Sequence, residues 1–242
     1  MQFLLFSQIP FEIIHPIDLI ESYCFQSDFY VSYDLLSNRS IEDVSKIGAR
    51  IDKNLLLKCK IVIGQTKHLT MFKYDLDQFL NLTEKTRIKH IKELDAKVVQ
   101  KLLRFKGIGL SRATKVLHTL YPKIIPMIDK QLQQEYLSKV NQGWTQEQAF
   151  QILIDYYNNF IKGDNRQNLN KLSENLKQNK IKCLTKIRIF DILWWSYLKA
   201  KKLSEKEDIN WSVIKWKNYK GPGPNNQHVK RGTFQRGWPE DE

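Results

Sequence analysis

Residues 102–117 read LLRFKGIGLSRATKVL, and residues 125–129 read IPMID. Apolar positions on both sides of the Gly107-Ile108-Gly109 tripeptide recur at helical spacing, so the segment predicts two helices joined by a tight hairpin. The hairpin can expose consecutive backbone N–H groups, because neither glycine carries a Cβ that would block approach. The second helix begins there, with unpaired N–H groups and the positive end of its dipole. These features predict a backbone site for an anion such as a phosphate.

The two hairpin helices are expected near residues 96–105 and 110–120. Asp95 is in position to cap the first helix. Leu94 and Val99 have the spacing of a hydrophobic staple across its first turn. Local sequence signals therefore predict where the first helix begins.

Helical patterns dominate the rest of the chain as well. Prolines at positions 122 and 126 exclude a continuous helix after the hairpin. Further helices are expected to begin at polar residues that precede apolar runs: Ser40, Asn54, Thr83, Asp129, Thr145 and Thr185. No alternating pattern longer than five residues predicts a strand, so the fold class is expected to be all-α.

The charge of the chain indicates the kind of partner. The 242 residues carry a formal net charge of +13 at neutral pH, with a sequence pI near 9.5. Residues 85–130 hold twelve lysines or arginines and three acids, so most of the excess charge surrounds the hairpin. A basic surface of this kind suits nucleic acid, and a hydrophobic content of 42% suffices for a full core in one or two lobes. DNA is therefore the expected partner, while the sequence names no protein partner.

Membrane and secreted proteins are not the expected classes. The N-terminal run MQFLLF is apolar, but it has no basic flank and ends before Pro10, so it does not predict a signal peptide. No run approaches the ~18 apolar residues of a membrane span. Cys24, Cys59 and Cys183 are isolated and lack metal-ligand spacing, which is typical of buried thiols in a reduced compartment. The expected location is intracellular, cytoplasmic or nuclear, and no bound metal is expected.

The chain is expected to divide into a helical domain, residues 1–203, and a C-terminal tail, residues 204–242. Between Trp211 and Pro239 the tail holds six lysines or arginines, no acid and three tryptophans. Basic residues interleaved with aromatic ones suit phosphate contact and stacking on exposed bases. The alternative is an extended tail whose tryptophans pack on the globular body.

The hairpin and the aspartate twenty residues beyond Gly109 resemble the helix-hairpin-helix signature of the DNA glycosylase superfamily (HhH-GPD). Ala113 matches the small residue that this family has in the second helix, and IPMID matches its apolar, proline-containing approach to an aspartate. The resemblance implies a two-lobed helical bundle, a damaged base flipped into the cleft between the lobes, and Asp129 as the catalytic carboxylate of base excision repair. No iron–sulfur cluster is expected, because the four cysteines that hold one in some members of the superfamily are missing, and the resemblance allows a monovalent cation at the hairpin.

The same resemblance indicates the DNA-binding residues and the type of reaction. The residues expected to contact DNA belong to the hairpin and its neighbourhood: Lys106, Gly107, Ile108, Gly109, Ser111, Arg112, Lys115 and Lys130. Ser111 stands where family members that also cut the DNA backbone have an imine-forming lysine. The implied reaction is hydrolysis of an N-glycosidic bond without lyase activity, in which a carboxylate stabilises positive charge on the sugar.

Other interpretations stay open at this point. Asp129 is equally well placed to cap a helix. A non-catalytic DNA-binding protein could retain the fold, and a nuclease or recombination accessory is a third class, although no carboxylates of the two-metal type are clustered in the sequence. The chain also resembles an uncharacterised family with the same hairpin and an Ile-Pro-x-x-Asp ending.

A slot for the base is not defined by the sequence. Several aromatic residues after Asp129 could line it, although aromatics at helical spacing are more often core residues: Trp144, Tyr156, Tyr157, Trp194 and Trp195. His90 and His118 flank the hairpin helices and are expected to be packing or surface residues.

Overall fold

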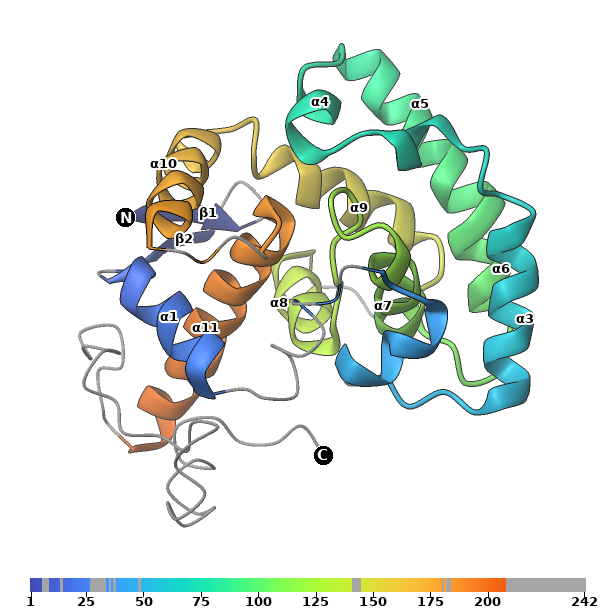
Figure 1. Cartoon of the computed structure of the whole chain (residues 1–242), viewed down its shortest axis with the longest axis horizontal. Coiled ribbons are helices and arrows are strands. Elements are labelled where there is room, and N and C mark those ends of the chain that lie inside the picture. The colour runs from blue at the N-terminus through green and yellow to red at the C-terminus, as the bar shows by residue number, and fades with distance from the viewer. Residues whose placement is uncertain are drawn as a thin grey trace.

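The computed structural model describes residues 1–5, 9–13, 15–26, 34, 36, 38–47, 49–140, 145–179, 181 and 184–207. Most of these residues are helical, which confirms the predicted helical character (Figure 1). The elements are β1 Gln2–Leu5, β2 Ile9–Glu12, α1 Pro16–Gln26, η1 Ile41–Ile47, α3 Lys53–Gly64, η2 Thr70–Lys73, α4 Leu76–Leu80, α5 Glu84–Leu94, η3 Asp95–Val99, α6 Gln100–Leu103, α7 Leu110–Leu120, α8 Lys130–Val140, α9 Gln148–Asn158, α10 Asn165–Gln178 and α11 Lys186–Glu207. Among the helices of these ranges, none is long and apolar enough to cross a membrane.

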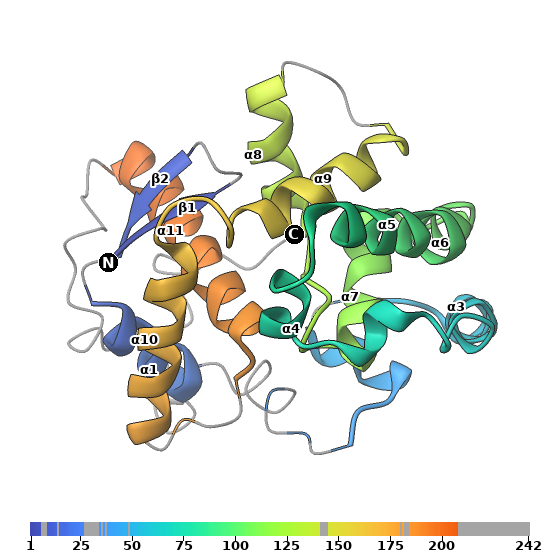
Figure 2. The ribbon, with the colours of Figure 1, turned by 90° about the horizontal axis from the view of Figure 1, so that it is seen from above.

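The two ends of the described chain pack together. In Figure 1, β1, β2, α1, α10 and α11 gather on one side of the molecule, and α3 to α7 with α9 form the other. Figure 2 shows the same division from above. Asn165, at the start of α10, joins the N-terminal strand to the C-terminal helices. Its side chain accepts a hydrogen bond from Leu4 N and donates one to Leu4 O, both at 2.7 Å.

The N-terminal hairpin departs from the all-α expectation. β1 and β2 form a two-stranded antiparallel sheet in which Phe3 pairs with Phe11. Phe3 and Leu5 alternate onto the buried face, and both phenylalanines contact Phe190 of α11. Each strand has four residues, too few for alternation to stand out from a short apolar run. Packing against α11 therefore decides this local structure.

The first hairpin helix begins earlier than predicted, and Asp95 does not cap it. α5, the π-helical turn η3 and α6 follow one another without a break from Glu84 to Leu103. Asp95 has helical dihedral angles (φ −58°, ψ −58°), and its carboxylate accepts a hydrogen bond from the Gln100 side chain at 3.1 Å. No glycine or proline interrupts this stretch, so the helix that Thr83 caps runs through the aspartate. Leu94 and Val99 are buried, but they do not staple a helix start.

Three of the other predicted helix starts are confirmed, whereas Thr145 does not cap α9, whose N-cap residue is Glu147. The side-chain oxygens of Thr83, Asp129 and Thr185 accept backbone N–H groups three residues later, at 3.3, 2.9 and 3.2 Å. α7 spans Leu110–Leu120, as predicted for the second hairpin helix. Asn54 is not a cap: the Asp52 carboxylate accepts from Leu55 N at 2.9 Å, so α3 begins one residue before Asn54. Aspartate and asparagine cap about equally well, and the sequence does not decide between neighbouring candidates.

Candidate functional site

The two glycines of the hairpin differ in whether their backbone conformation requires glycine. Gly107 has a positive φ of 92°, a conformation that side chains other than glycine rarely adopt. Gly109 has φ −92° and ψ 178°, which suits any residue, and a Cβ added there would meet nothing within 4 Å. The fold therefore requires glycine at position 107 and leaves an open, exposed surface at position 109.

This open surface lies at the N-terminus of α7. Gly109 is the N-cap residue, so no N-cap side chain occupies the N–H groups of the first turn of α7. Ile108, between the two glycines, packs into the core. It is 5% exposed, and its N–H donates to Phe105 O at 2.9 Å. The Arg112 guanidinium donates to Gly107 O and braces the turn.

The expected DNA-binding side chains fall into two groups. Lys106 and Arg112 are exposed at the hairpin, and Lys130 is exposed in the first turn of α8. Ser111 is half-buried. Lys115 is also half-buried, but it faces a pocket rather than the surface of the hairpin.

A pocket lies between α7, α11 and the segment that precedes α8. Its walls include five apolar or aromatic side chains: Ile47, Met127, Ile192, Trp194 and Trp195. Trp194 is buried, whereas Trp195 is half-buried. The polar groups that line the pocket are Tyr23, Lys115, Asp129, Arg188 and Asp191. The structure thus places the predicted carboxylate, a lysine and two tryptophans around one concave site.

Asp129 is held in this pocket by backbone contacts on both sides. Ile128 N donates to Thr114 Oγ1 of α7 at 3.0 Å, and Met127 N donates to Asp191 Oδ2 of α11 at 3.4 Å. Asp129 Oδ1 accepts from Leu132 N at 2.9 Å, which begins α8. The aspartate is therefore both a helix cap and a pocket residue, so the two interpretations of its role are compatible.

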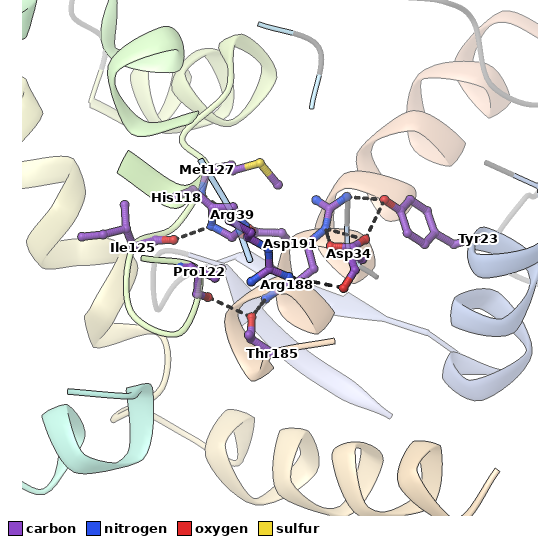
Figure 3. Close-up of polar contacts among 10 residues, drawn as sticks. All are labelled: Tyr23, Asp34, Arg39, His118, Pro122, Ile125, Met127, Thr185, Arg188 and Asp191. Atoms are coloured by element: carbon purple, nitrogen blue, oxygen red, sulfur yellow. Dashed lines mark hydrogen bonds and ion pairs between the residues drawn. The ribbon is translucent and has the colours of Figure 1, made fainter. Parts of the chain in front are cut away.

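A buried histidine fixes the same segment to α7. His118 is fully buried, and its Nδ1 lies 2.6 Å from the carbonyl oxygen of Ile125 (Figure 3). Burial lowers the pKa of His118 to about 3, because the charged ring would lose its hydration. The ring is neutral near pH 7 and contributes to packing, as the sequence predicted.

Asp191 was not found by sequence reasoning, yet it is the second carboxyl group of the pocket. It is 3% exposed, and its Oδ1 accepts hydrogen bonds from the Tyr156 hydroxyl at 2.6 Å and from Trp194 Nε1 at 3.4 Å. Burial raises the pKa of Asp191 to about 7, although the Tyr156 hydrogen bond and the Arg188 charge oppose this shift. The sequence does contain a signal for this residue, because Asp191 interrupts the otherwise largely apolar segment IRIFDILWW, residues 187–195.

A buried ion pair lies one turn before Asp191. Arg188 Nε lies 3.2 Å from Asp34 Oδ1 and 3.3 Å from Oδ2, and its guanidinium also donates to the Tyr23 hydroxyl (Figure 3). The side chains of Arg188 and Asp34 are 8% and 3% exposed. Burial disfavours the guanidinium charge, but the Asp34 carboxylate opposes this and holds the pKa of Arg188 above its ordinary value. The pair ties the N-terminal part of the chain to α11, beside the pocket.

The stability of the Asp191→Asn variant relative to the wild type is expected to depend on pH. Between about pH 4 and 7 the folded wild type retains a proton on Asp191 that the unfolded chain has lost, so the wild type loses stability as the pH rises. Asparagine does not titrate. The free energy of unfolding of the variant minus that of the wild type should therefore rise by on the order of 2 kcal/mol between pH 5 and 7. Denaturant unfolding at several pH values measures it, and a constant difference would exclude the shifted carboxyl.

The comparison with known proteins gives a family. A model described as "Family of unknown function (DUF6308)" matches residues 74–198, just over half of the chain. The chain belongs to this family. The matched region contains the hairpin, Asp129, Arg188 and Asp191, whereas Tyr23 and Asp34 lie outside it. Neither a curated protein nor a solved structure matches the chain.

Some of the predicted residues lie in the core or outside the described ranges. Tyr156 and Tyr157 are buried and are not among the residues that line the pocket. The Tyr157 hydroxyl donates to Ile124 O at 2.5 Å. His90 is also largely buried. Trp144 and the tail from residue 208 onward, with Trp211, lie outside the described residues, and α11 extends the helical region to Glu207.

Proposed function

We propose that this protein binds the DNA backbone through its 107–112 hairpin and hydrolyses the N-glycosidic bond of a base extruded into the pocket. The observation that carries the proposal is the arrangement along α7. The open N-terminus of this helix begins at Leu110, and Lys115, five residues later, lines the pocket with Asp129. Five residues of helix span about 8 Å, so a phosphate at the hairpin and a base in the pocket could belong to neighbouring parts of one strand.

The pocket provides groups suited to this reaction. The half-buried Trp195 offers a surface on which an extruded base could stack. The Asp129 carboxylate stabilises the positive charge that develops on the sugar as the glycosidic bond breaks, and it can orient the attacking water. Ser111 has no amine for an imine, so the proposed reaction leaves an intact abasic strand.

A second candidate function is DNA binding without catalysis. The observation that favours it is the hydrogen bond from Leu132 N to Asp129 Oδ1, because capping α8 is by itself a sufficient reason for an aspartate at this position. The two candidates share the hairpin and differ in the role of the Asp129 charge. Substitution of Asp129 distinguishes them.

Substituting Gly109 is expected to weaken DNA binding without harming the fold. Gly109→Asp adds a good N-cap residue in open space, but it places a carboxylate where a phosphate would bind. We expect at least about a tenfold loss of duplex affinity at low salt, and a less steep dependence of affinity on salt, because a phosphate contact is lost. Fluorescence anisotropy at several salt concentrations measures both effects.

Gly64→Asp is the matched control for this experiment. Gly64 ends α3, is exposed, and also has nothing within 4 Å of an added Cβ. The control changes the net charge by the same amount, so it reports the effect of overall charge on DNA binding. Equal losses of affinity in the two variants would argue against a phosphate site at the hairpin.

A further inference from the structure

The pocket contains two carboxyl groups in opposite surroundings. Asp129 is partly exposed at the start of α8, where a backbone N–H and the positive end of the helix stabilise a negative charge. Asp191 is buried within α11, where burial favours the protonated form. Two carboxyl groups whose surroundings favour different protonation states can divide the roles of anion and acid in one reaction.

The hydrogen bonds of Asp191 indicate which oxygen carries its proton. Oδ1 accepts from the Tyr156 hydroxyl at 2.6 Å and from Trp194 Nε1 at 3.4 Å, and an indole N–H can act only as a donor. Oδ2 is approached by the backbone N–H of Met127 at 3.4 Å, a longer contact than that from Tyr156. The proton of the neutral acid is therefore placed on Oδ2, on the side of the carboxyl group that faces the segment carrying Asp129.

The charges around Asp191 are compatible with a protonated, neutral carboxyl group. The ionisable groups that line the pocket with it, or that interact with it or with Arg188, come from α1, α7, α9, α11 and the segment before α8: Tyr23, Lys115, His118, Tyr156, Tyr157, Arg188 and Asp129. His118 is neutral, and burial keeps both tyrosines of α9 protonated. Arg188 is the closest cation along α11, and its charge is already paired with Asp34.

We propose that Asp191 is the general acid of this pocket and that the base it releases is a neutral one. The inference rests on the proposed function and adds a residue and a substrate class to it. As the bond between the sugar C1′ and the base nitrogen breaks, its electron pair stays on the base, and the Asp191 proton moves to a ring nitrogen of that base. Water adds to C1′, and the proton that it loses restores Asp191. A base that is already cationic leaves without this proton, so the acid is needed for neutral bases.

The test compares two kinds of base in otherwise identical duplexes. Full-length wild type and Asp191→Asn are assayed on hypoxanthine, which is neutral, and on N7-methylguanine, which is cationic. General acids contribute about a hundredfold or more. The variant should therefore lose at least about a hundredfold in hypoxanthine release and stay within a few-fold of wild type on N7-methylguanine. The hypoxanthine rate of the wild type should fall as the pH rises through about 7.

Each other outcome has a distinct meaning. Equal losses on the two bases would mean that Asp191 only supports the pocket, and release of N7-methylguanine alone by the wild type would also overturn the inference. If the wild type releases no base from either duplex while still binding both, the proposed function itself fails, and this inference fails with it. Lys115→Gln is the matched control, because Lys115 is the other proton donor tested in the pocket. If this variant selectively loses hypoxanthine release and Asp191→Asn does not, Lys115 is the acid.

A second variant keeps the carboxyl group and provides a test if only hypoxanthine is released. Tyr156→Phe preserves the ring but removes the hydroxyl that donates to Asp191 Oδ1 at 2.6 Å. This hydrogen bond stabilises the ionised form, so its loss should move the falling limb of the pH profile upward, by about one pH unit. A limb that stays in place would overturn the assignment of the acid to Asp191.

Discussion

Replacing Asp129 by asparagine is expected to slow base release at least about a hundredfold while leaving affinity for the intact duplex unchanged. In the proposed reaction the substitution removes the negative charge that would stabilise the cationic transition state, and a group of this kind lowers the barrier by roughly 3 kcal/mol or more. Duplex affinity should not change, because the proposed phosphate site is at Gly109, whereas the carboxylate lies in the pocket. Single-turnover assays on duplexes with uracil, alkylated, oxidised and hypermodified bases measure the rate, and anisotropy measures affinity.

Asparagine is the informative replacement because it separates the charge from the helix cap. Asp129 Oδ1 accepts from Leu132 N, and an asparagine oxygen can accept the same hydrogen bond. The matched control is Asp52→Asn, which makes the same change at the N-cap of α3, where Oδ1 accepts from Leu55 N at 2.9 Å. Full activity in Asp129→Asn would remove the catalytic role and leave the non-catalytic DNA-binding protein as the better interpretation.

The product of the reaction tests the part of the proposal that depends on Ser111. Hydrolysis leaves an intact abasic strand, so borohydride should trap no covalent complex between the protein and DNA. A stable adduct would show that an amine attacks the sugar. Lys115 would then be the first lysine to replace, because it stands one helical turn beyond Ser111 and lines the pocket.

The parts of this structure that depend on local sequence were predictable. Gly107 and the bounds of α7 follow from turn chemistry and helical spacing, and Asp129 was recognised both as a helix cap and as a candidate carboxylate. One exception at this level is Asn54, because the neighbouring Asp52 caps α3 instead. Another is Asp95, whose cap signal is overridden by a continuous helix between residues 84 and 103. A capping residue changes stability by about 1 kcal/mol, so packing on both sides of it can outweigh the signal.

The second carboxyl group and the ion pair depend on contacts that are distant in sequence. Asp191 contacts Tyr156, 35 residues away, and Arg188 contacts Asp34, 154 residues away. Periodicity places Asp191 on a buried helix, but it does not indicate what surrounds the side chain. The β1–β2 hairpin also depends on a distant partner, Phe190, and so it was missed for the same physical reason.

Replacing Arg188 by methionine is expected to cost about 3–5 kcal/mol of stability, a large part of what a domain of this size has. The variant leaves the Asp34 carboxylate buried without its guanidinium partner, and burial then penalises the remaining charge. Replacing both residues, Asp34→Leu with Arg188→Met, should recover most of this loss, because the pair is then exchanged for apolar contacts. Denaturant unfolding of wild type, both single variants and the double variant measures the coupling.

The exposed pair of Lys60 and Glu42 is the matched control for this cycle. Both side chains are about half exposed, so Lys60→Met should cost less than about 1 kcal/mol, because water already solvates the two charges. If Arg188→Met costs no more than Lys60→Met, the Arg188–Asp34 pair does not stabilise the attachment of α11 to the N-terminal part of the chain. A large loss in Arg188→Met that the double variant does not repair would instead place the main contribution of Arg188 in its contact with the Tyr23 ring, 5.3 Å away, and not in the charge of Asp34.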